Sequence, residues 1–128
     1  MTHIPTEEEL IKLTLGIMMM LEEWHVAEED QIVLLGLPEE VKPRHMQRYR
    51  KGTPLPNDEE VMLRVEQLIA IYDALRTSFP RNTAFGAKWL VSRNRYLNNV
   101  TPMEMMLRDG LEGMHHVRGR LDCTVNWI

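Results

Sequence analysis

Six side chains suited to contacting nucleic acid lie close together near the middle of the chain. Arginine and lysine bind phosphate oxygens, while arginine and glutamine form paired hydrogen bonds with the edges of guanine and adenine. On a helix, Met46 and either Tyr49 or Arg50 would turn away from the surface that the six share. The six candidates for DNA contact are Lys42, Arg44, His45, Gln47, Arg48 and Lys51.

The chain as a whole is acidic, and its charges are unevenly distributed. Its formal net charge is −4, and Lys12 is the one Lys or Arg among residues 1–40. Such a protein is not suited to coating nucleic acid, but a local basic patch is compatible with docking at a particular DNA sequence. The basic cluster also fits a solvated surface that balances the acidic N-terminal third, and the pattern leaves both interpretations open.

Two short helices are predicted around this cluster. The first covers residues 28–35; Gly36 is its predicted C-terminal cap, and Pro38 prevents the helix from continuing. The second lies between Pro43 and Gly52. A short helix, a turn and a second short helix with a polar face are typical of a helix-turn-helix, in which the second helix lies in the major groove.

Helical periodicity covers the rest of the chain as well. An amphipathic helix is predicted from Thr6 to about His25, and a long one from Asn57 or Asp58 to about Phe79. Further helices are expected from about Thr83 to Val91 and from Thr101 onward, and no alternating segment of strand length stands out. The sequence therefore predicts an all-α fold, with a helix-turn-helix-like module in residues 1–56 and a small helical domain in residues 57–128.

Residues that could support catalysis or hold a metal ion are few. Glu22, Glu23 and His25 form a carboxylate–imidazole cluster, but no further ligands for a metal site are identifiable. His115 and His116 are adjacent, so a helix directs them to different sides, and they cannot share a metal ion as residues four apart do. Phosphate-binding glycine loops, recognisable nucleophiles and dinucleotide-binding patterns do not occur. We expect a protein that is not an enzyme and has no metal or cofactor.

The composition is that of a small helical protein. The chain has 128 residues, 44% of them hydrophobic and 6% aromatic, with 10 Met and one Cys. Methionine fills irregular gaps between packed helices, and the single Cys123 excludes an internal disulfide. No apolar run reaches the roughly 18 residues of a membrane span, and acidic residues stand where a signal peptide is basic. We therefore expect a cytoplasmic protein.

The C-terminal third contains the most specific pattern. A helix is predicted to end near Trp89, and after a polar loop a new helix opens with Thr101 as its N-cap and Pro102 in its first position. Glu104 lies three residues after Thr101 and completes a predicted capping box. Two glycines then precede a last helical turn or two. The residues of the pattern are Trp89, Leu90, Asn94, Leu97, Thr101, Pro102, Glu104, Leu107, Gly110 and Gly113.

This pattern resembles the C-terminal toxin-binding domain of the Xre/MbcA/ParS family of antitoxins. Where the family has two glycines after the leucine, this chain has Asn98 and Asn99, and asparagine tolerates the left-handed backbone that such a turn needs. The resemblance extends over residues 28–121. In its basic module, Arg48 and Tyr49 stand where the family often has Arg–Trp, and Gly52, Leu55 and Pro56 also match. Pro43 is a departure that shortens the second helix or sets its first turn.

The resemblance implies an antitoxin that binds and occludes a toxin enzyme, typically a RES-domain protein that consumes NAD+. Together with the toxin, such a protein binds its own promoter through the basic helix and represses it. In the family the C-terminal end can reach toward the toxin active site, so residues 110–128 are the best candidates for direct contact; Trp127 could anchor in the partner or fold back onto the core. The candidate residues for the toxin-binding part are Trp89, Asn94, Thr101, Pro102, Gly110, Gly113, Arg118, Arg120, Asn126 and Trp127.

Two other functions stay open from the sequence. A stand-alone DNA-binding regulator would bind its operator without a toxin, and a helical interaction module would bind a partner protein without DNA. Proteins with a helix-turn-helix usually read two half-sites as dimers. We therefore expect a homodimer as well as a complex with the toxin, with the apolar helix between Leu10 and Trp24 as the candidate dimer interface.

Overall fold

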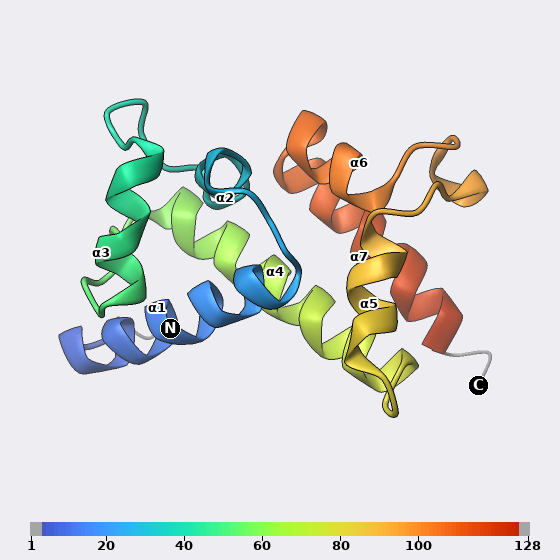
Figure 1. Cartoon of the computed structure of the whole chain (residues 1–128), viewed down its shortest axis with the longest axis horizontal. Helices are drawn as coiled ribbons and strands as arrows, with labels where there is room; N and C mark the ends of the chain where they lie inside the picture. Colours follow the sequence, from blue (N-terminus) through green and yellow to red (C-terminus); the bar gives the residue numbers. More distant parts are fainter. Residues whose placement is uncertain (1–3, 126–128) are drawn as a thin grey trace.

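The predicted all-α fold is confirmed by the computed structural model of the chain, which describes residues 4–125 (Figure 1). These residues form seven α-helices and two short 3-10 helices joined by turns and loops, and no strand occurs among them. The α-helices are α1 (Glu7–Glu23), α2 (Glu28–Leu35), α3 (Met46–Arg50), α4 (Glu59–Ser78), α5 (Thr83–Leu90), α6 (Pro102–Asp109) and α7 (Leu111–Val125), and the 3-10 helices are η1 (Pro43–His45) and η2 (Arg95–Leu97).

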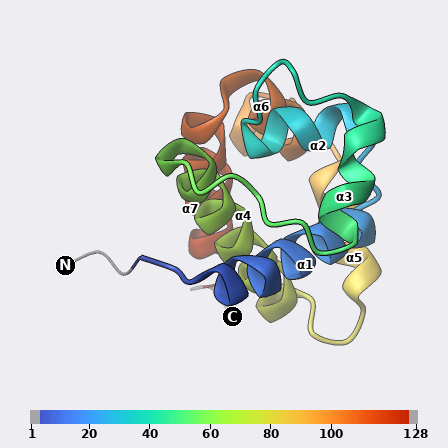
Figure 2. The same cartoon turned by 90° about the vertical axis from the view of Figure 1, so that its left-hand side faces the viewer.

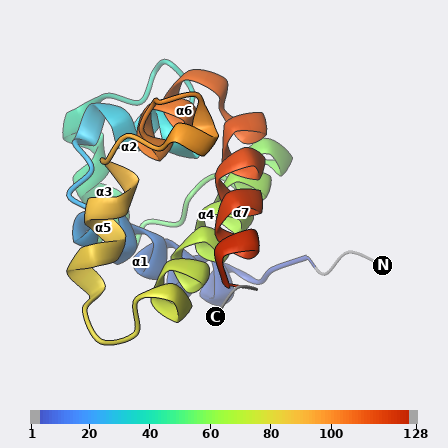
Figure 3. The ribbon, with the colours of Figure 1, turned by 90° about the vertical axis from the view of Figure 1, so that its right-hand side faces the viewer.

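Helix α4 is the central element. It runs between α1 to α3 on one side and α5 to α7 on the other (Figure 1). Its buried apolar residues recur every three or four positions, which places them on the faces that meet the other helices. The most extensive packing of α4 is against α7, and Figure 3 shows these two helices side by side. The buried apolar residues of α4 are Val61, Val65, Leu68, Ile71 and Leu75.

The N-terminal helices are defined by local capping and by one buried hydrogen-bonded contact. Thr6 forms a capping box with Glu9 at the start of α1, and Gly36 ends α2 in the left-handed conformation, with φ of 66°. Helix α3 packs beside α1 (Figure 2). The buried Thr14 hydroxyl donates to the Leu10 carbonyl at 2.7 Å and accepts from the Leu55 N–H at 2.9 Å, which fixes the chain after α3 to α1.

A single hydrophobic core contains residues from both ends of the chain. Leu21 and Leu34 from the N-terminal helices are fully buried in the same cluster as Leu90 and Val117 from the C-terminal helices. Methionine is abundant in it, in agreement with the composition. The buried methionines are Met18, Met20, Met46, Met105, Met106 and Met114. Among the residues described, no helix is both long and apolar enough to span a membrane.

The last helix is longer than predicted. The sequence pattern indicated a final turn or two after two glycines, whereas α7 continues from Leu111 to Val125. Gly113 does not end the helix, because it packs against the backbone of α6: a Cβ at this position would collide with the Met105 carbonyl. The burial of Met114 and Val117 in the core stabilises α7 and outweighs the low helix propensity of glycine.

Candidate functional site

Five of the six residues predicted to contact DNA form one exposed basic surface over η1 and α3. The apolar residues Met46 and Tyr49 turn inward and are buried, and Arg50 turns toward Glu28, with 3.7 Å between its Nη2 and the Glu28 Oε1. The alternation of buried and exposed positions along this short helix therefore leaves the remaining polar side chains in solvent. The basic surface consists of Lys42, Arg44, Gln47, Arg48 and Lys51.

His45 lies differently from the other five. It is half-buried, and its Nδ1 accepts a hydrogen bond from the Lys42 N–H at 2.9 Å, so the ring caps η1. Desolvation lowers the pKa of His45, and the positive charges of Arg48, Arg44 and Lys42 lower it further. The neutral imidazole is thus the form that this local structure requires, and its Nδ1 is not available to a base edge.

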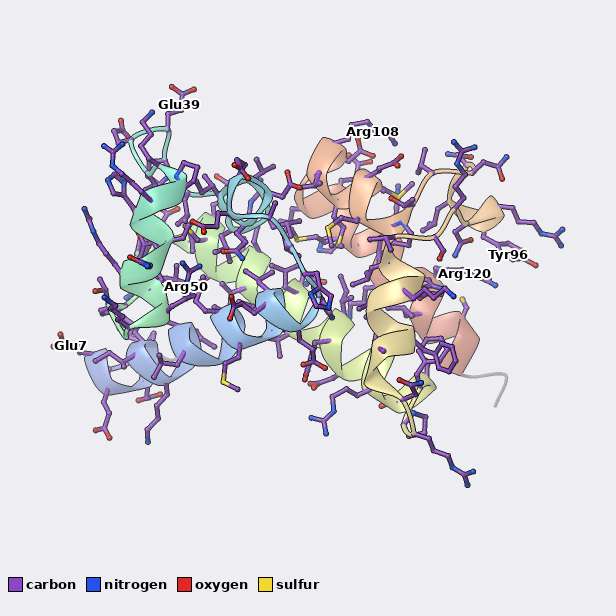
Figure 4. The ribbon with its side chains drawn as sticks, viewed as in Figure 1. Glu7, Glu39, Arg50, Tyr96, Arg108 and Arg120 are labelled. Carbon is purple, nitrogen blue, oxygen red and sulfur yellow. The ribbon has the colours of Figure 1, made fainter. Side chains whose placement is uncertain are left out.

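The connection that leads into the basic surface departs from a standard helix-turn-helix. Residues 36–42 join α2 to η1, whereas the standard turn has about three or four residues. Pro43 occupies the first position of η1 and sets its first turn. The loop also exposes Glu39 (labelled in Figure 4) and Glu40, and the Lys42 ammonium donates to the Glu39 carbonyl at 3.2 Å. Acidic side chains beside the basic surface oppose close approach of phosphates from that direction.

The predicted tight turn between α5 and α6 is confirmed. Asn98 and Asn99 both adopt the left-handed conformation, with φ of 59° and 63°. The backbone of Asn94 pairs with Val100 across the turn, and the Asn94 side chain accepts from the Tyr96 N–H at 2.9 Å. Asn94 therefore stabilises the turn through both its backbone and its side chain.

The start and the end of α6 also follow the sequence pattern, with one exception. Thr101 accepts from the Glu104 N–H at 3.0 Å, Pro102 is buried in the first position, and Gly110 ends the helix with φ of 62°. The predicted capping box is wrong in its second half, because the exposed Glu104 side chain returns no hydrogen bond to Thr101 among the residues described.

Several of the other predicted toxin-binding residues have internal partners. Trp89 is half-buried and packs against the core. Arg118 donates to the Gln67 Oε1 at 3.2 Å and lies 4.0 Å from the Asp122 Oδ2, so it links α7 to α4. Asn126 and Trp127 lie outside the described residues.

Arg120, a predicted toxin-binding residue, is part of an exposed aromatic and cationic surface whose other members, Tyr96 and Arg95, were not among the predicted candidates. The Arg120 guanidinium carbon lies 3.7 Å from the centroid of the Tyr96 ring, and that of Arg95 lies 5.4 Å from it. Tyr96 is 61% exposed although it is a large aromatic residue. Its hydroxyl has a lowered pKa, mainly through hydrogen bonding and charge interaction with Arg95, and further through the charge of Arg120. Figure 4 shows Tyr96 and Arg120 together, at the end of the molecule opposite Glu7 and Arg50.

A hollow of about 560 Å³ lies next to this stacked pair. We call the pair, the hollow and Arg95 the C-terminal platform. Residues of η2, α6 and α7 line the hollow, and none of them carries a carboxylate. Such a surface suits flat or anionic groups of a protein partner, since aromatic stacking and the positive charges of the arginines both favour them. The lining residues are Tyr96, Leu97, Asn98, Met105, His115, His116, Gly119, Arg120 and Cys123.

The described residues contain no group of three or more His, Cys, Asp or Glu side chains that could hold a metal ion. Glu23, one of the carboxylates considered in the sequence analysis, accepts a hydrogen bond from the Tyr72 hydroxyl at 2.7 Å. Cys123 is exposed at the edge of the C-terminal platform.

Comparisons of the chain with protein families, with characterised proteins and with solved structures found no match.

Proposed function

We propose that this protein is an antitoxin of the Xre/MbcA/ParS type, which binds and occludes a cognate toxin enzyme through the C-terminal platform. The observation that carries the proposal is the Tyr96–Arg120 stack, because a large aromatic side chain stays exposed between two arginines beside a hollow. Exposed tyrosine and arginine residues are typical of the centres of protein interfaces. By resemblance, the toxin is a RES-domain enzyme that degrades NAD+.

A role in DNA binding is proposed for the basic surface. Five side chains that can contact phosphates or base edges project from η1 and α3 into solvent, while the apolar side chains of the same segment are buried. In this proposal the complex of antitoxin and toxin represses its own promoter in the cytoplasm. The connection before η1 is long and carries acidic residues, so we expect the free protein to bind DNA weakly. The bound toxin would then contribute to the affinity of the complex for DNA.

The proposal is tested by affinity capture of the tagged protein from its native host. The wild type, the double variant Tyr96→Ala/Arg120→Glu and the control Arg81→Glu are compared; Arg81 is exposed in the loop between α4 and α5. We expect a stoichiometric partner with the wild type and the control, and its loss with the double variant. Once freed, the partner should degrade NAD+, and this activity should stop when the wild-type protein is added back.

Other outcomes point to the two alternative functions. A wild-type protein that is recovered with DNA and without a partner protein would overturn the antitoxin proposal in favour of a stand-alone regulator. A partner that has no NAD+-degrading activity and binds equally well to the double variant would indicate a helical interaction module that does not use the C-terminal platform.

A further inference from the structure

A third surface, formed by other residues than the basic surface and the C-terminal platform, lies along α1 and α4. A hollow of about 690 Å³ is bounded by Leu13, Gly16 and Met19 of α1 and by Ile69 of α4. A second hollow, of about 470 Å³, lies between the chain just before α1 and the first turns of α4, where Ile4 and Leu63 line it. We call the two hollows together the α1–α4 groove.

The two hollows follow the same face of α4. Met62 and Glu66 line one hollow, and Ile69 and Tyr72 line the other. These four positions are spaced by four, three and three residues, which places them on one side of a helix. Both hollows therefore lie along one side of α4. Helix α1 forms the second wall of the larger hollow, and Ile4 and Pro5 form that of the smaller one.

Two apolar side chains of the groove are largely exposed to solvent. Met19 is 73% exposed and Ile4 is 79% exposed. Gly16 lies in the middle of α1, where glycine lowers helix stability, and no heavy atom lies within 4 Å of a Cβ built there. Packing inside the molecule thus gives no reason for a glycine at this position. A small residue on a helix face does allow another helix to approach closely.

Every charged residue that lines the groove is acidic. These residues are Glu22 and Glu23 of α1 and Glu59 and Glu66 of α4. Glu23 accepts the hydrogen bond from Tyr72, and the other three carboxylates form no ion pair with the part of the chain that the structure describes. Two copies that paired through this face would place acidic rims against each other, which is unfavourable. A partner with basic side chains around an apolar face would complement both the apolar and the acidic residues of the groove.

We propose that the α1–α4 groove docks a basic amphipathic helix of a partner protein, and that this site is separate from the surfaces proposed for toxin and DNA. Helix α1 has 17 residues and is therefore about 25 Å long, which matches a partner helix of about four to five turns. The apolar face of that helix would contact Met19 and Ile69, and its Lys or Arg side chains would pair with Glu22 and Glu66. Recognition of this kind follows the helix-in-groove mode.

The test uses a synthetic helix of about 18 residues as the probe, with leucines along one face and lysines elsewhere. A second probe has the same leucines and glutamates in place of the lysines. Both are titrated into the full chain, with binding followed by fluorescence anisotropy and by the methyl NMR signals of methionine. We expect the basic probe to bind with shifts of Met19, Met20 and Met62, while the signals of Met105 and Met114 in the core near α6 and α7 stay in place.

Met19→Asp separates docking in the groove from unspecific attraction between charges. This variant makes the protein more acidic, so unspecific attraction would strengthen binding of the basic probe. Docking in the groove instead predicts affinity weaker by about tenfold or more, because an apolar contact is lost. Met19 is mostly exposed, so folding should not suffer. Val91→Asp, at a 59% exposed apolar position that does not line either hollow, is the control and should leave affinity unchanged or slightly higher.

Several results would overturn the proposal. Equal binding of the lysine and glutamate probes would show that the acidic residues of the groove do not contribute to recognition. Tighter binding of the basic probe by Met19→Asp would show attraction by charge alone. A dimer of the free wild-type protein in sedimentation that Met19→Asp converts to a monomer would assign the groove to a second copy of the chain. None of these results affects the antitoxin proposal, which depends on Tyr96 and Arg120.

Discussion

Arg64 of α4 lies directly over Gly36, the residue that ends α2. A Cβ built on Gly36 would come within 2.7 Å of the Arg64 Cδ, and one built on Gly110 would come within 3.1 Å of its Nη2. The guanidinium also donates to the Glu60 carboxylate at 3.1 Å and approaches the Val33 carbonyl at 3.5 Å. One arginine thereby joins the ends of α2 and α6 to the central helix.

The first prediction concerns Gly36 and Gly16. Gly36→Ala should lower the free energy of unfolding by about 1–2 kcal/mol or more, because alanine is strained at φ of 66° and its Cβ displaces Arg64. Gly16→Ala, in the middle of α1 with open space around it, should raise this free energy by about 0.5–1 kcal/mol. Urea denaturation of both variants gives the comparison, and equal effects of the two substitutions would contradict the interpretation.

The second prediction concerns the buried hydroxyl of Thr14. Thr14→Val keeps the side-chain shape but leaves the Leu55 N–H without an acceptor, so we expect a loss of about 1–3 kcal/mol in the free energy of unfolding. Thr77 donates its hydroxyl to the Asp73 carbonyl on the exposed side of α4, and Thr77→Val should change stability by less than about 0.5 kcal/mol. If Thr14→Val lowered the free energy of unfolding as little as Thr77→Val, the contact between α1 and Leu55 would contribute little to stability.

The third prediction concerns the effect of pH on His45. Its pKa is lowered in the folded protein, so the unfolded chain takes up the proton first as the pH falls below about 6.5. Above that pH the ring is neutral in both states and stability is unaffected. As the pH falls from 6.5 through the lowered pKa, stability should decrease. Between pH 7 and pH 5, the melting temperature of the wild type should therefore fall by more than the melting temperature of His45→Asn.

The fourth prediction concerns the ionisation of two tyrosines. The pKa of Tyr96 is lowered, with Arg95 as the main cause and Arg120 as a further one, whereas the pKa of Tyr72 is raised, mainly by its hydrogen bond to Glu23. Arg95→Ala should raise the pKa of Tyr96, and Arg120→Ala should raise it less. Carbon NMR of the ring Cζ atoms against pH measures both tyrosines, and Tyr72 is the internal control. If neither substitution changes the pKa of Tyr96, the stacked arrangement does not exist in solution.

The fifth prediction concerns the basic surface and uses salt dependence. If the surface contacts phosphates, Arg44→Ala/Arg48→Ala should weaken binding of promoter DNA and reduce the slope of log K against log salt by about two. Fluorescence anisotropy at several salt concentrations, with the captured partner present and absent, measures this slope. Arg93→Ala/Arg81→Ala removes two exposed arginines elsewhere and should leave the slope unchanged. Identical slopes for both double variants would remove DNA binding from the proposed function.

The sequence by itself determined most of the local structure. Thr6, Gly36, Thr101 and the pair Asn98–Asn99 act on hydrogen bonds or backbone angles within a few residues of themselves. Helical periodicity likewise agrees with the burial of Val61, Val65, Leu68 and Leu75 along α4. Such effects depend on near neighbours in the chain, so the pattern of residues is sufficient to predict them.

Only the tertiary structure decided which distant side chains meet. Tyr96 lies beside Arg120 because η2 and α7 pack together, and Arg64 reaches Gly36 and Gly110 because α4 lies between the two halves of the fold. The continuation of α7 past Gly113 has the same origin, since burial against α4 and α6 outweighs local propensity. These contacts depend on the shapes of side chains far apart in sequence, and no local pattern encodes them.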